Sequence, residues 1–406
     1  MTTRVESSGV ESWREAFESI RAALPGERDV AFEAFAARGF PTNRVEAWKY
    51  TSLRPLARQR FRPAEPDRDA VVPFLNAGPR IVLVNGFLRE DLTTVPVGRW
   101  AGPDNRAGVE DEALVALNAA MAGDGYVLTI AEIRDEPIEI VHATVPSPTG
   151  PVAQSRNRIV IASGGTARVI ERHIALGKGA YFVNGVTEVE VQAGGQLHHT
   201  KLQEEGADAH HLWFMPVQLD RDAVLESAVF TFGARLSRNQ IEADIFGEGA
   251  TLALNGAYAI AGRQLADHTS RIEHRAPGAT SRQVYKGAIG GQARGVFQGH
   301  IIVAEGAQKT DGQQLNRALL LSGRAEIDAK PVLEIYADDV QCSHGATAGD
   351  IDGDALFYLR SRGIPANSAR GLLVRAFLSE ILDETPEDAL RRAVEDRIDA
   401  FLEVGA

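Results

Sequence analysis

The chain has 406 residues, of which 44% are hydrophobic and 24% charged, so it is long enough for two or three domains around a large core. Its formal net charge of −12 lacks the basic footprint of a nucleic-acid-binding protein. The single cysteine excludes an intramolecular disulfide and a cluster held by four thiolates of one chain. No stretch has the pattern of a signal peptide or a membrane span, so we expect a cytoplasmic protein that binds neither nucleic acid nor membrane.

The first part of the chain, residues 1–125, is expected to form a helical or mixed domain. Apolar residues recur at helical spacing from Trp13 to Leu24, and Pro25-Gly26 ends that run. The aromatic stretch around Trp48 and Tyr50 is interpreted as a packing corner, because the chain is too acidic for a base-stacking surface. Asn85-Gly86 follows a short strand and predicts a β-hairpin, and a helix is predicted over 112–121.

The middle part, residues 126–345, is predicted to be rich in β-strands. Short strand-like runs are separated by small glycine turns, and neighbouring members of the series lie roughly 14–17 residues apart. No strong helical pattern interrupts the region, which argues against a doubly wound sheet. A sandwich stays possible, but the recurring turns favour a β-helix, whose open ends we expect the helical segments on either side to cap. The predicted strands are 126–130, 158–162, 167–173, 185–191, 223–232, 251–257, 295–304, 318–321 and 331–336.

The only cysteine lies where this β-rich region gives way to helices. Cys342 and His344 are two residues apart, so in an extended strand they project from one face, together with Asp338 if the strand is regular. A thiolate beside an imidazole is a suitable ligand pair for zinc or iron, although a closed tetrahedral site needs four ligands. The residues alone also allow a buried cysteine used as apolar filler and a hydrogen-bonded histidine.

The last part, residues 346–406, is predicted to be helical. One short helix covers 354–362, and Ser368 is expected to cap a second helix whose apolar stripe includes Leu373, Phe377 and Ile381. Thr385-Pro386 is expected to begin the last helix. The stripe can either pack on the body of the protein or dock another protein, and the sequence does not decide between these roles.

Other motifs that carry chemistry are missing from the sequence. There is no Walker A loop, no dinucleotide-binding fingerprint and no nucleophile elbow. The histidines of the pairs 198–199 and 210–211 face opposite ways on a strand, whereas His268 and His274 share a face if their strand is unbroken. Each of these histidines is interpreted as a polar strand residue rather than a ligand.

Several motifs together resemble the SufB/SufD family of the SUF iron–sulfur cluster assembly system, and the resemblance extends over nearly the whole chain. Its length and its single cysteine are similar to those of the SufD members rather than the SufB members. The motifs are RVEAWKYTSL at 44–53, Lys286-Gly287, TDGQQ at 310–314, DVQCSHGAT at 339–347 and DALFYLRSRGI at 354–364.

This resemblance implies a right-handed parallel β-helix core flanked by helical parts, in a scaffold subunit that is not itself an enzyme. It implies pairing with a SufB-like paralogue through the β-helix, and docking of a SufC-like ABC ATPase on the C-terminal helices. Cys342 and His344 are then candidates for holding a transient iron–sulfur cluster shared with the partner, and a flavin is possible in the complex. The alternatives are a β-helix enzyme acting on polysaccharide and a stand-alone metal-binding homodimer, and a homodimer is also possible for the isolated chain.

Overall fold

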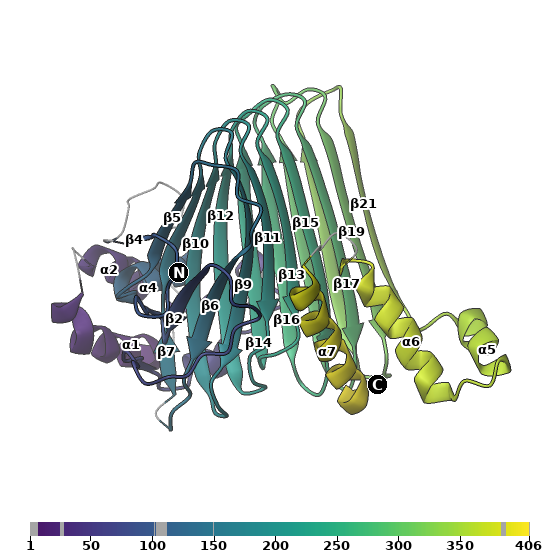
Figure 1. Cartoon of the computed structure of the whole chain (residues 1–406), viewed down its shortest axis with the longest axis horizontal. Helices are drawn as coiled ribbons and strands as arrows, with labels where there is room; N and C mark the ends of the chain where they lie inside the picture. The colour runs from purple at the N-terminus through teal and green to yellow at the C-terminus, as the bar shows by residue number, and fades with distance from the viewer. Residues whose placement is uncertain are drawn as a thin grey trace.

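Two long β-sheets lie face to face and run the length of the molecule (Figure 1). This computed structural model describes residues 7–24, 28–100, 102, 112–148, 150–382 and 387–405. Successive long strands alternate between the sheets, and each pairs in parallel with the strand two places further along the chain. The chain therefore winds as a parallel β-helix, which confirms the predicted fold class and excludes the sandwich.

The first sheet contains the even-numbered long strands, and the second contains the odd-numbered ones. The first holds β8 (Arg156–Ile161), β10 (Tyr181–Val191), β12 (Ala209–Leu219), β14 (Leu236–Ile245), β16 (Leu265–His274), β18 (Arg294–Val303) and β20 (Glu326–Ile335). The second holds β9 (Thr166–Ala175), β11 (Gln196–Gln203), β13 (Val224–Thr231), β15 (Thr251–Ile260), β17 (Thr280–Ile289), β19 (Asp311–Leu320) and β21 (Gln341–Gly349).

One full coil of the β-helix spans about thirty residues. In the second sheet Thr251 pairs with Thr280, Thr280 with Asp311, and Asp311 with Gln341, which are steps of 29, 31 and 30 residues. The spacing of 14–17 residues found in the sequence therefore corresponds to half a coil, that is, one strand and one turn. Inward-facing side chains of both sheets fill the lumen between them with a continuous apolar cluster, which contributes about 1.5–3 kcal/mol for each large side chain buried.

The N-terminal end of the β-helix is closed by shorter strands. Asn85 and Gly86, with φ of 56° and 87°, form the two-residue turn of the predicted hairpin between β2 and β3. Leu88 and Val95 are buried against the lumen cluster and cover its end. The short strands are β1 (Arg62–Pro63), β2 (Arg80–Val84), β3 (Phe87–Leu88), β4 (Gly98–Arg99), β5 (Tyr126–Ile130), β6 (Ile138–Thr144) and β7 (Pro151–Ala153).

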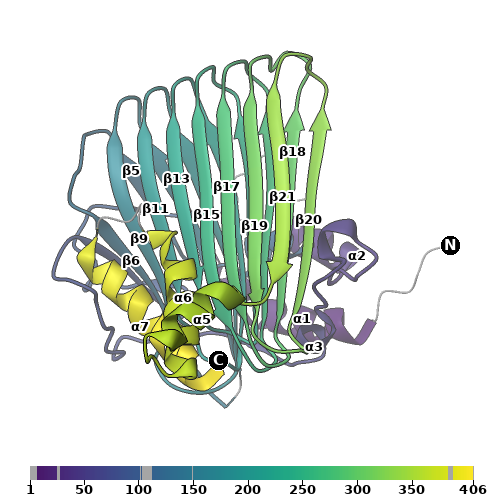
Figure 2. The ribbon, with the colours of Figure 1, turned by 90° about the vertical axis from the view of Figure 1, so that its right-hand side faces the viewer.

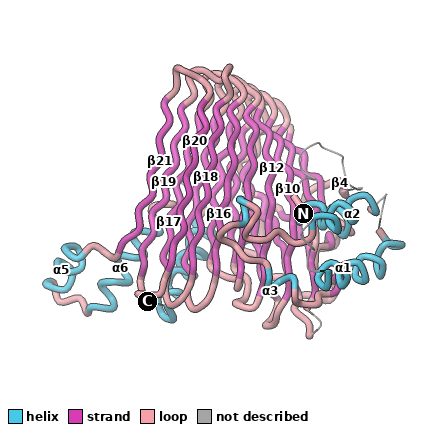
Figure 3. Tube along the Cα trace, turned by 180° about the vertical axis from the view of Figure 1, so that it is seen from behind, coloured by secondary structure: helices cyan, strands magenta, loops and turns pink. Residues whose placement is uncertain are grey.

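The N-terminal helices pack on the outer face of the first sheet (Figure 3). Trp48 is almost fully buried there, and the Arg238 guanidinium lies 4.0 Å from the centre of its ring, so the predicted packing corner is confirmed. Arg238 also forms an ion pair with Asp267, which accepts a hydrogen bond from Thr51. These elements are α1 (Ser7–Ile20), η1 (Arg21–Ala23), α2 (Asp29–Arg38), η2 (Glu46–Trp48), α3 (Arg54–Ala57) and α4 (Ala113–Met121).

The C-terminal helices α5 (Gly353–Ser361), α6 (Ala366–Ser379) and α7 (Asp388–Gly405) lie on the side of the second sheet (Figure 2). Buried residues of α6 and α7, such as Val374 and Val394, pack on outward-facing residues of the sheet, such as Phe230. Helices at both termini thus cover faces of the β-helix, and the expectation that they cap its ends is wrong at the C-terminal end. The reason is that their apolar stripes match the broad apolar faces of the sheets.

Some local predictions are corrected, and others lie outside the described residues. Ser368 is inside α6, whose preceding residue is Pro365, so Ser368 does not cap that helix. Asp338 lies in a bend before β21 and does not share a strand with Cys342. Pro25-Gly26 and Thr385-Pro386 fall outside the described residues. Within the described part of the chain, no helix is both long and apolar enough to cross a membrane.

Candidate functional site

The last coil of the β-helix leaves an open end. β20 and β21 are the terminal strands of their sheets, and each is paired on one side only among the described strands (Figure 2). Their residues are exposed or half-buried, whereas the coils before them are buried in alternation. An unpaired edge presents free backbone N–H and C=O groups, which makes it suited to receive another strand.

Cys342 and His344 both lie at the mouth of the lumen at this open end. They pair in register with Gly312 and Gln314 of β19, and side chains in register on parallel strands face the same way. Gln314 is buried in the lumen, so Cys342 and His344 also face the lumen. Cys342 is half-buried against the lumen cluster, and His344 is exposed. The predicted shared face of these two residues is confirmed.

The environment of Cys342 keeps its thiol protonated. Burial is the largest cause and raises the pKa of this thiol; a hydrogen bond with the Gly312 backbone lowers that pKa by less, and the carboxylate of Asp311 raises it slightly. Since the thiolate is the form that binds metal, Cys342 needs a metal ion or a partner's positive charge to ionise it. Among the described residues, no third His, Cys, Asp or Glu completes a ligand set with Cys342 and His344.

The predicted docking residues of α6 differ in how accessible they are. Ile381 follows α6 and is buried against the second sheet, so it stabilises the chain's own fold, whereas Leu373 and Phe377 are half-buried in the same cluster. The Lys286 ammonium lies 4.8 Å from the centre of the Phe377 ring. The most exposed large apolar side chains of these helices are those of Phe357 at 72%, Tyr358 at 57% and Leu372 at 48%.

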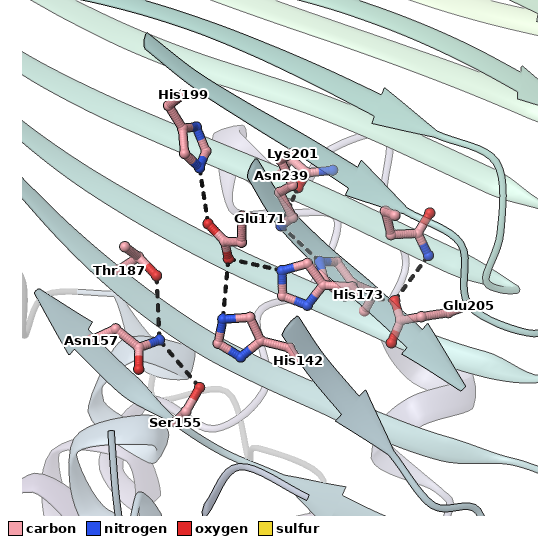
Figure 4. Close-up of polar contacts among 12 residues, drawn as sticks. His142, Ser155, Asn157, Glu171, His173, Thr187, His199, Lys201, Glu205 and Asn239 are labelled. Atoms are coloured by element: carbon pink, nitrogen blue, oxygen red, sulfur yellow. Dashed lines mark hydrogen bonds and ion pairs between the residues drawn. The ribbon is translucent and has the colours of Figure 1, made fainter. Parts of the chain in front are cut away.

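The lumen contains a polar cluster that the sequence did not identify. Near the closed end, the carboxylate of Glu171 is surrounded by the imidazoles of His142, His173 and His199 (Figure 4). One strand further along the chain, His211 lies 2.7 Å from Glu205 and accepts a hydrogen bond from Lys201. The sequence signal for this cluster is an alternation of polar residues along two strands, Glu171-x-His173 and His199-x-Lys201-x-Gln203. It was missed because inward positions of a strand are expected to be apolar.

Burial sets the charge state of these groups. Burial lowers the pKa of His142 to about 4 and that of Lys201 to about 7, in each case as the largest cause. Burial alone would raise the pKa of Glu171, but hydrogen bonds with His173 and His199 outweigh it and hold that pKa well below its usual range. The ionised carboxylate of Glu171 is therefore accompanied by the neutral imidazoles of His142 and His173.

The prediction that the neighbouring histidines face opposite ways holds for both pairs. His198 is half-exposed on the outer face of β11, and His199 is buried in the lumen. His210 packs against Phe61 of the N-terminal part, and His211 lies in the lumen. His268 and His274 share the lumen face of the unbroken strand β16, as predicted.

The chain matches two family models and many known proteins. The SufBD core domain of the SUF system for iron–sulfur cluster assembly matches residues 144–377, and the SufBD N-terminal region matches residues 12–64. The iron–sulfur cluster assembly protein SufD of Escherichia coli K12 is 32% identical, over 98% of each chain. A SufBD family iron–sulfur cluster assembly protein of Synechocystis is 30% identical, over 91% of this chain and 89% of its own. The chloroplastic protein ABCI7 of Arabidopsis thaliana is 28% identical, over 92% of this chain and 85% of its own.

Proposed function

Since the chain belongs to the SufBD family of iron–sulfur cluster assembly proteins, we propose that it is the non-ATPase scaffold subunit of a cluster assembly complex. The observation that carries this proposal is the open last coil, which presents Cys342 and His344 at the mouth of the lumen. In this role the iron–sulfur cluster is the cargo being built, not a resident cofactor. The single cysteine fits a reducing compartment, and we propose the cytoplasm as the location.

The partner at the open end is a SufB-like paralogue with a similar β-helix. Its last coil would extend both sheets through the free edges of β20 and β21. It would also cover apolar side chains at the mouth of the lumen, where Leu333 is half-buried and Ile335 is 41% exposed. In the absence of this partner, a second copy of the chain can use the same edges, which accounts for the predicted homodimer.

The cluster forms between the two chains in this proposal. The exposed imidazole of His344 is the first ligand offered to iron, and the half-buried thiol of Cys342 ionises when iron arrives. Two ligands from one chain leave room for ligands from the partner, as a transient site requires. A flavin in the assembled complex stays a prediction that follows from the resemblance.

The ATPase docks on the C-terminal helices in this proposal. ATP hydrolysis belongs to that partner, because the sequence has no Walker A loop of its own. The exposed Phe357 and Tyr358 of α5 and Leu372 of α6, beside the half-buried Leu373 and Phe377, offer an apolar surface for it. Only residues 350–352 separate β21 from α5. A movement of α5 driven by ATP would therefore act directly on the strand that carries Cys342 and His344.

The composition of the complex is the first test of this function. The tagged chain is purified gently and without oxygen, and native mass spectrometry is applied to what is recovered. A complex with a SufB-like paralogue and an ABC-type ATPase is expected. Recovery of the chain alone or only as a homodimer would overturn the scaffold proposal and favour the metal-binding homodimer or the β-helix enzyme.

The site itself is tested by His344→Ala and Cys342→Ser in the reconstituted complex. We expect each variant to lower the cluster yield with no change in subunit composition. His300→Ala is the matched control, because His300 is a half-exposed histidine near the same end and forms an ion pair with Glu334 on the outer side. Hydrogen exchange over 335–365 should respond to ATP in the wild-type complex, and an unchanged exchange pattern would exclude the proposed mechanical coupling.

A further inference from the structure

The histidine and glutamate cluster in the lumen has the composition of a metal site. The ligand atoms of His142, Glu171 and His173 all lie within 4.8 Å of one another, and all three residues are buried. Two imidazoles and one carboxylate form the ligand set used by non-haem iron(II) sites and by many zinc sites. Donor atoms around such an ion are about 3–4 Å apart, since each bond is about 2.1 Å long.

The strands deliver these three ligands to one point. His142 of β6 and His173 of β9 are in register on paired strands, and their rings stack with centres 4.6 Å apart. Glu171 is two residues before His173 on the same strand and so faces the lumen as well. The Nε2 atoms of His142 and His173 lie 3.5 Å and 2.8 Å from the same carboxylate oxygen, Oε1 of Glu171 (Figure 4).

The protein groups present do not satisfy this arrangement by themselves. One proton can join Glu171 to His173, but Nε2 of His142 is buried and has no hydrogen-bond partner. The unpartnered Nε2 of His142 and the shared oxygen of Glu171 therefore lie together in the buried lumen, where an unsatisfied polar atom is costly.

The neighbouring groups behave as supports for such a site. His199 lies 3.0 Å from the second oxygen of Glu171, and its other nitrogen lies 3.0 Å from the hydroxyl of Ser227. This pairing fixes the orientation of the carboxylate, as outer partners do around bound metals. Trp213 contacts the edges of both imidazoles, with ring centres 4.9 Å from His142 and 4.3 Å from His173.

The charge balance in this part of the lumen also leaves room for a cation. The buried carboxylates of Glu171 and Glu205 are accompanied by one buried ammonium, that of Lys201. Lys201 and His211 have protein partners of their own, since Lys201 donates to His211 and to Asn239, and His211 lies 2.7 Å from Glu205. Glu171 and Glu205 together therefore carry one negative charge more than Lys201 can balance, and Glu171 lies next to the unpartnered nitrogen of His142.

We propose that the lumen of the β-helix binds one divalent first-row transition-metal ion, iron(II) or zinc(II), through His142, Glu171 and His173, with His199 positioning the carboxylate. This site is separate from the open end that carries Cys342 and His344 and does not depend on the proposed scaffold function. Because its ligands are enclosed, the ion enters as the coils form and then exchanges slowly, and its binding free energy adds to the stability of the fold.

The test measures the metal content of the full-length chain. The chain is produced in medium supplemented with iron and zinc, or refolded with cobalt(II) as a visible-light probe, and is then washed with a chelator. We expect about one ion per folded chain, which unfolding in the presence of the chelator releases. Wild-type chains that retain none of the three metals would overturn the proposal.

Variants assign the ion to its ligands. His142→Leu is the most informative, because Nε2 of His142 has no hydrogen bond to lose, and we expect about tenfold or more loss of metal from a folded chain. His274→Leu is the matched control at a buried lumen histidine that bonds to Ser281, and it should keep the ion. Full retention of metal by His142→Leu would overturn the assignment.

A second measurement separates this site from the open end. The double variant with Cys342→Ser and His344→Ala should keep the ion, and loss of the ion from that variant would contradict the proposal. X-ray absorption of the metal-loaded wild type should show nitrogen and oxygen ligands with the scattering of imidazole. A sulfur ligand would place the ion at Cys342 instead, and this result is decisive even if a lumen variant fails to fold.

Discussion

The two ends of the β-helix present the same kinds of side chain in opposite environments. At the closed end, His142 and His173 face the lumen and are buried, and β2 pairs with the strand that carries His142. At the open end, His344 also faces the lumen, but no further coil covers it and it is exposed. Both positions follow from the same alternation along parallel strands. The difference between them arises only from whether another coil follows.

In a solenoid, residues that stabilise the fold and residues that can bind another molecule lie in different coils. Each interior coil is covered by a neighbour on both sides, so its polar lumen residues must find partners within the chain. The last coil has one neighbour, so its lumen residues remain available to another molecule. Side chains that would be structural in the middle of the stack therefore become candidates for binding at its end.

The largest expected effect is a loss of unfolding free energy when a leucine is truncated in a covered coil. The same change in the open last coil is the comparison. Leu197→Ala removes a fully buried lumen side chain and should lower the free energy of unfolding by about 2–5 kcal/mol. Leu333→Ala acts on a half-buried side chain of the last coil and should cost clearly less in the isolated chain. Urea unfolding of both variants gives the comparison, and equal losses would mean that the open end is covered in solution.

The pH dependence of stability tests burial of a lumen histidine. Burial lowers the pKa of His274 from 6.5 to about 4, and its neighbours on the flanking strands are the apolar Ile245 and Val303. Between these pH values the unfolded chain binds a proton that the folded chain does not, so stability falls as the pH falls. The loss is about 3 kcal/mol at most and is absent above pH 6.5.

A single variant isolates the contribution of the buried histidine. His274→Leu should flatten the slope of unfolding free energy against pH between about 6.5 and 4. The wild-type chain gives the reference slope. Denaturant unfolding at several pH values measures both slopes, and an unchanged slope in His274→Leu would show that His274 can be protonated in the folded state.

Adding a methyl group at a glycine tests the packing at each end. A Cβ atom on Gly185 would lie 1.9 Å from the indole of Trp213, so Gly185→Ala should cost about 1–3 kcal/mol through displacement of that ring. A Cβ atom on Gly349, at the end of β21, meets nothing within 4 Å, and Gly349→Ala should be nearly neutral. Thermal unfolding of the two variants would contradict this picture if Gly349→Ala were the more damaging.

The smallest expected effect is a change in the rate at which Cys342 is alkylated. The thiol of Cys342 is half-buried and its pKa is raised by burial. At pH 7.5, iodoacetamide should therefore modify this thiol more slowly than it modifies the thiol of free glutathione. Addition of a SufB-like partner should slow the reaction further if the open end is the interface. Mass spectrometry of the alkylated chain follows the reaction, and a rate that the partner leaves unchanged would indicate that the partner binds elsewhere.

Several strands were harder to predict because their lumen residues are polar. The segments 251–257 and 295–304 were recognised from their apolar content, and both lie in strands. The strands β14 and β17 are absent from the predicted strands, and β11, β12 and β16 are anticipated only through their histidines, since histidine, lysine, glutamine and arginine occur at positions that face inward or lie beneath the helices. Some of these side chains bond to other strands, as Lys201 does to Asn239 and Gln283 to Ser270, and a single strand does not reveal such partners.

The sequence by itself determined the β-helix class, the helical flanks, the shared face of Cys342 and His344, and the family. These features depend on local periodicity, turn residues and motifs, which lie within a short stretch of chain. Only the tertiary structure decided that the helices cover faces and leave the end open, and that His142 and His173 converge on Glu171. Those contacts join residues from different coils, and their register is fixed by the pairing of about thirty-residue repeats rather than by any one segment.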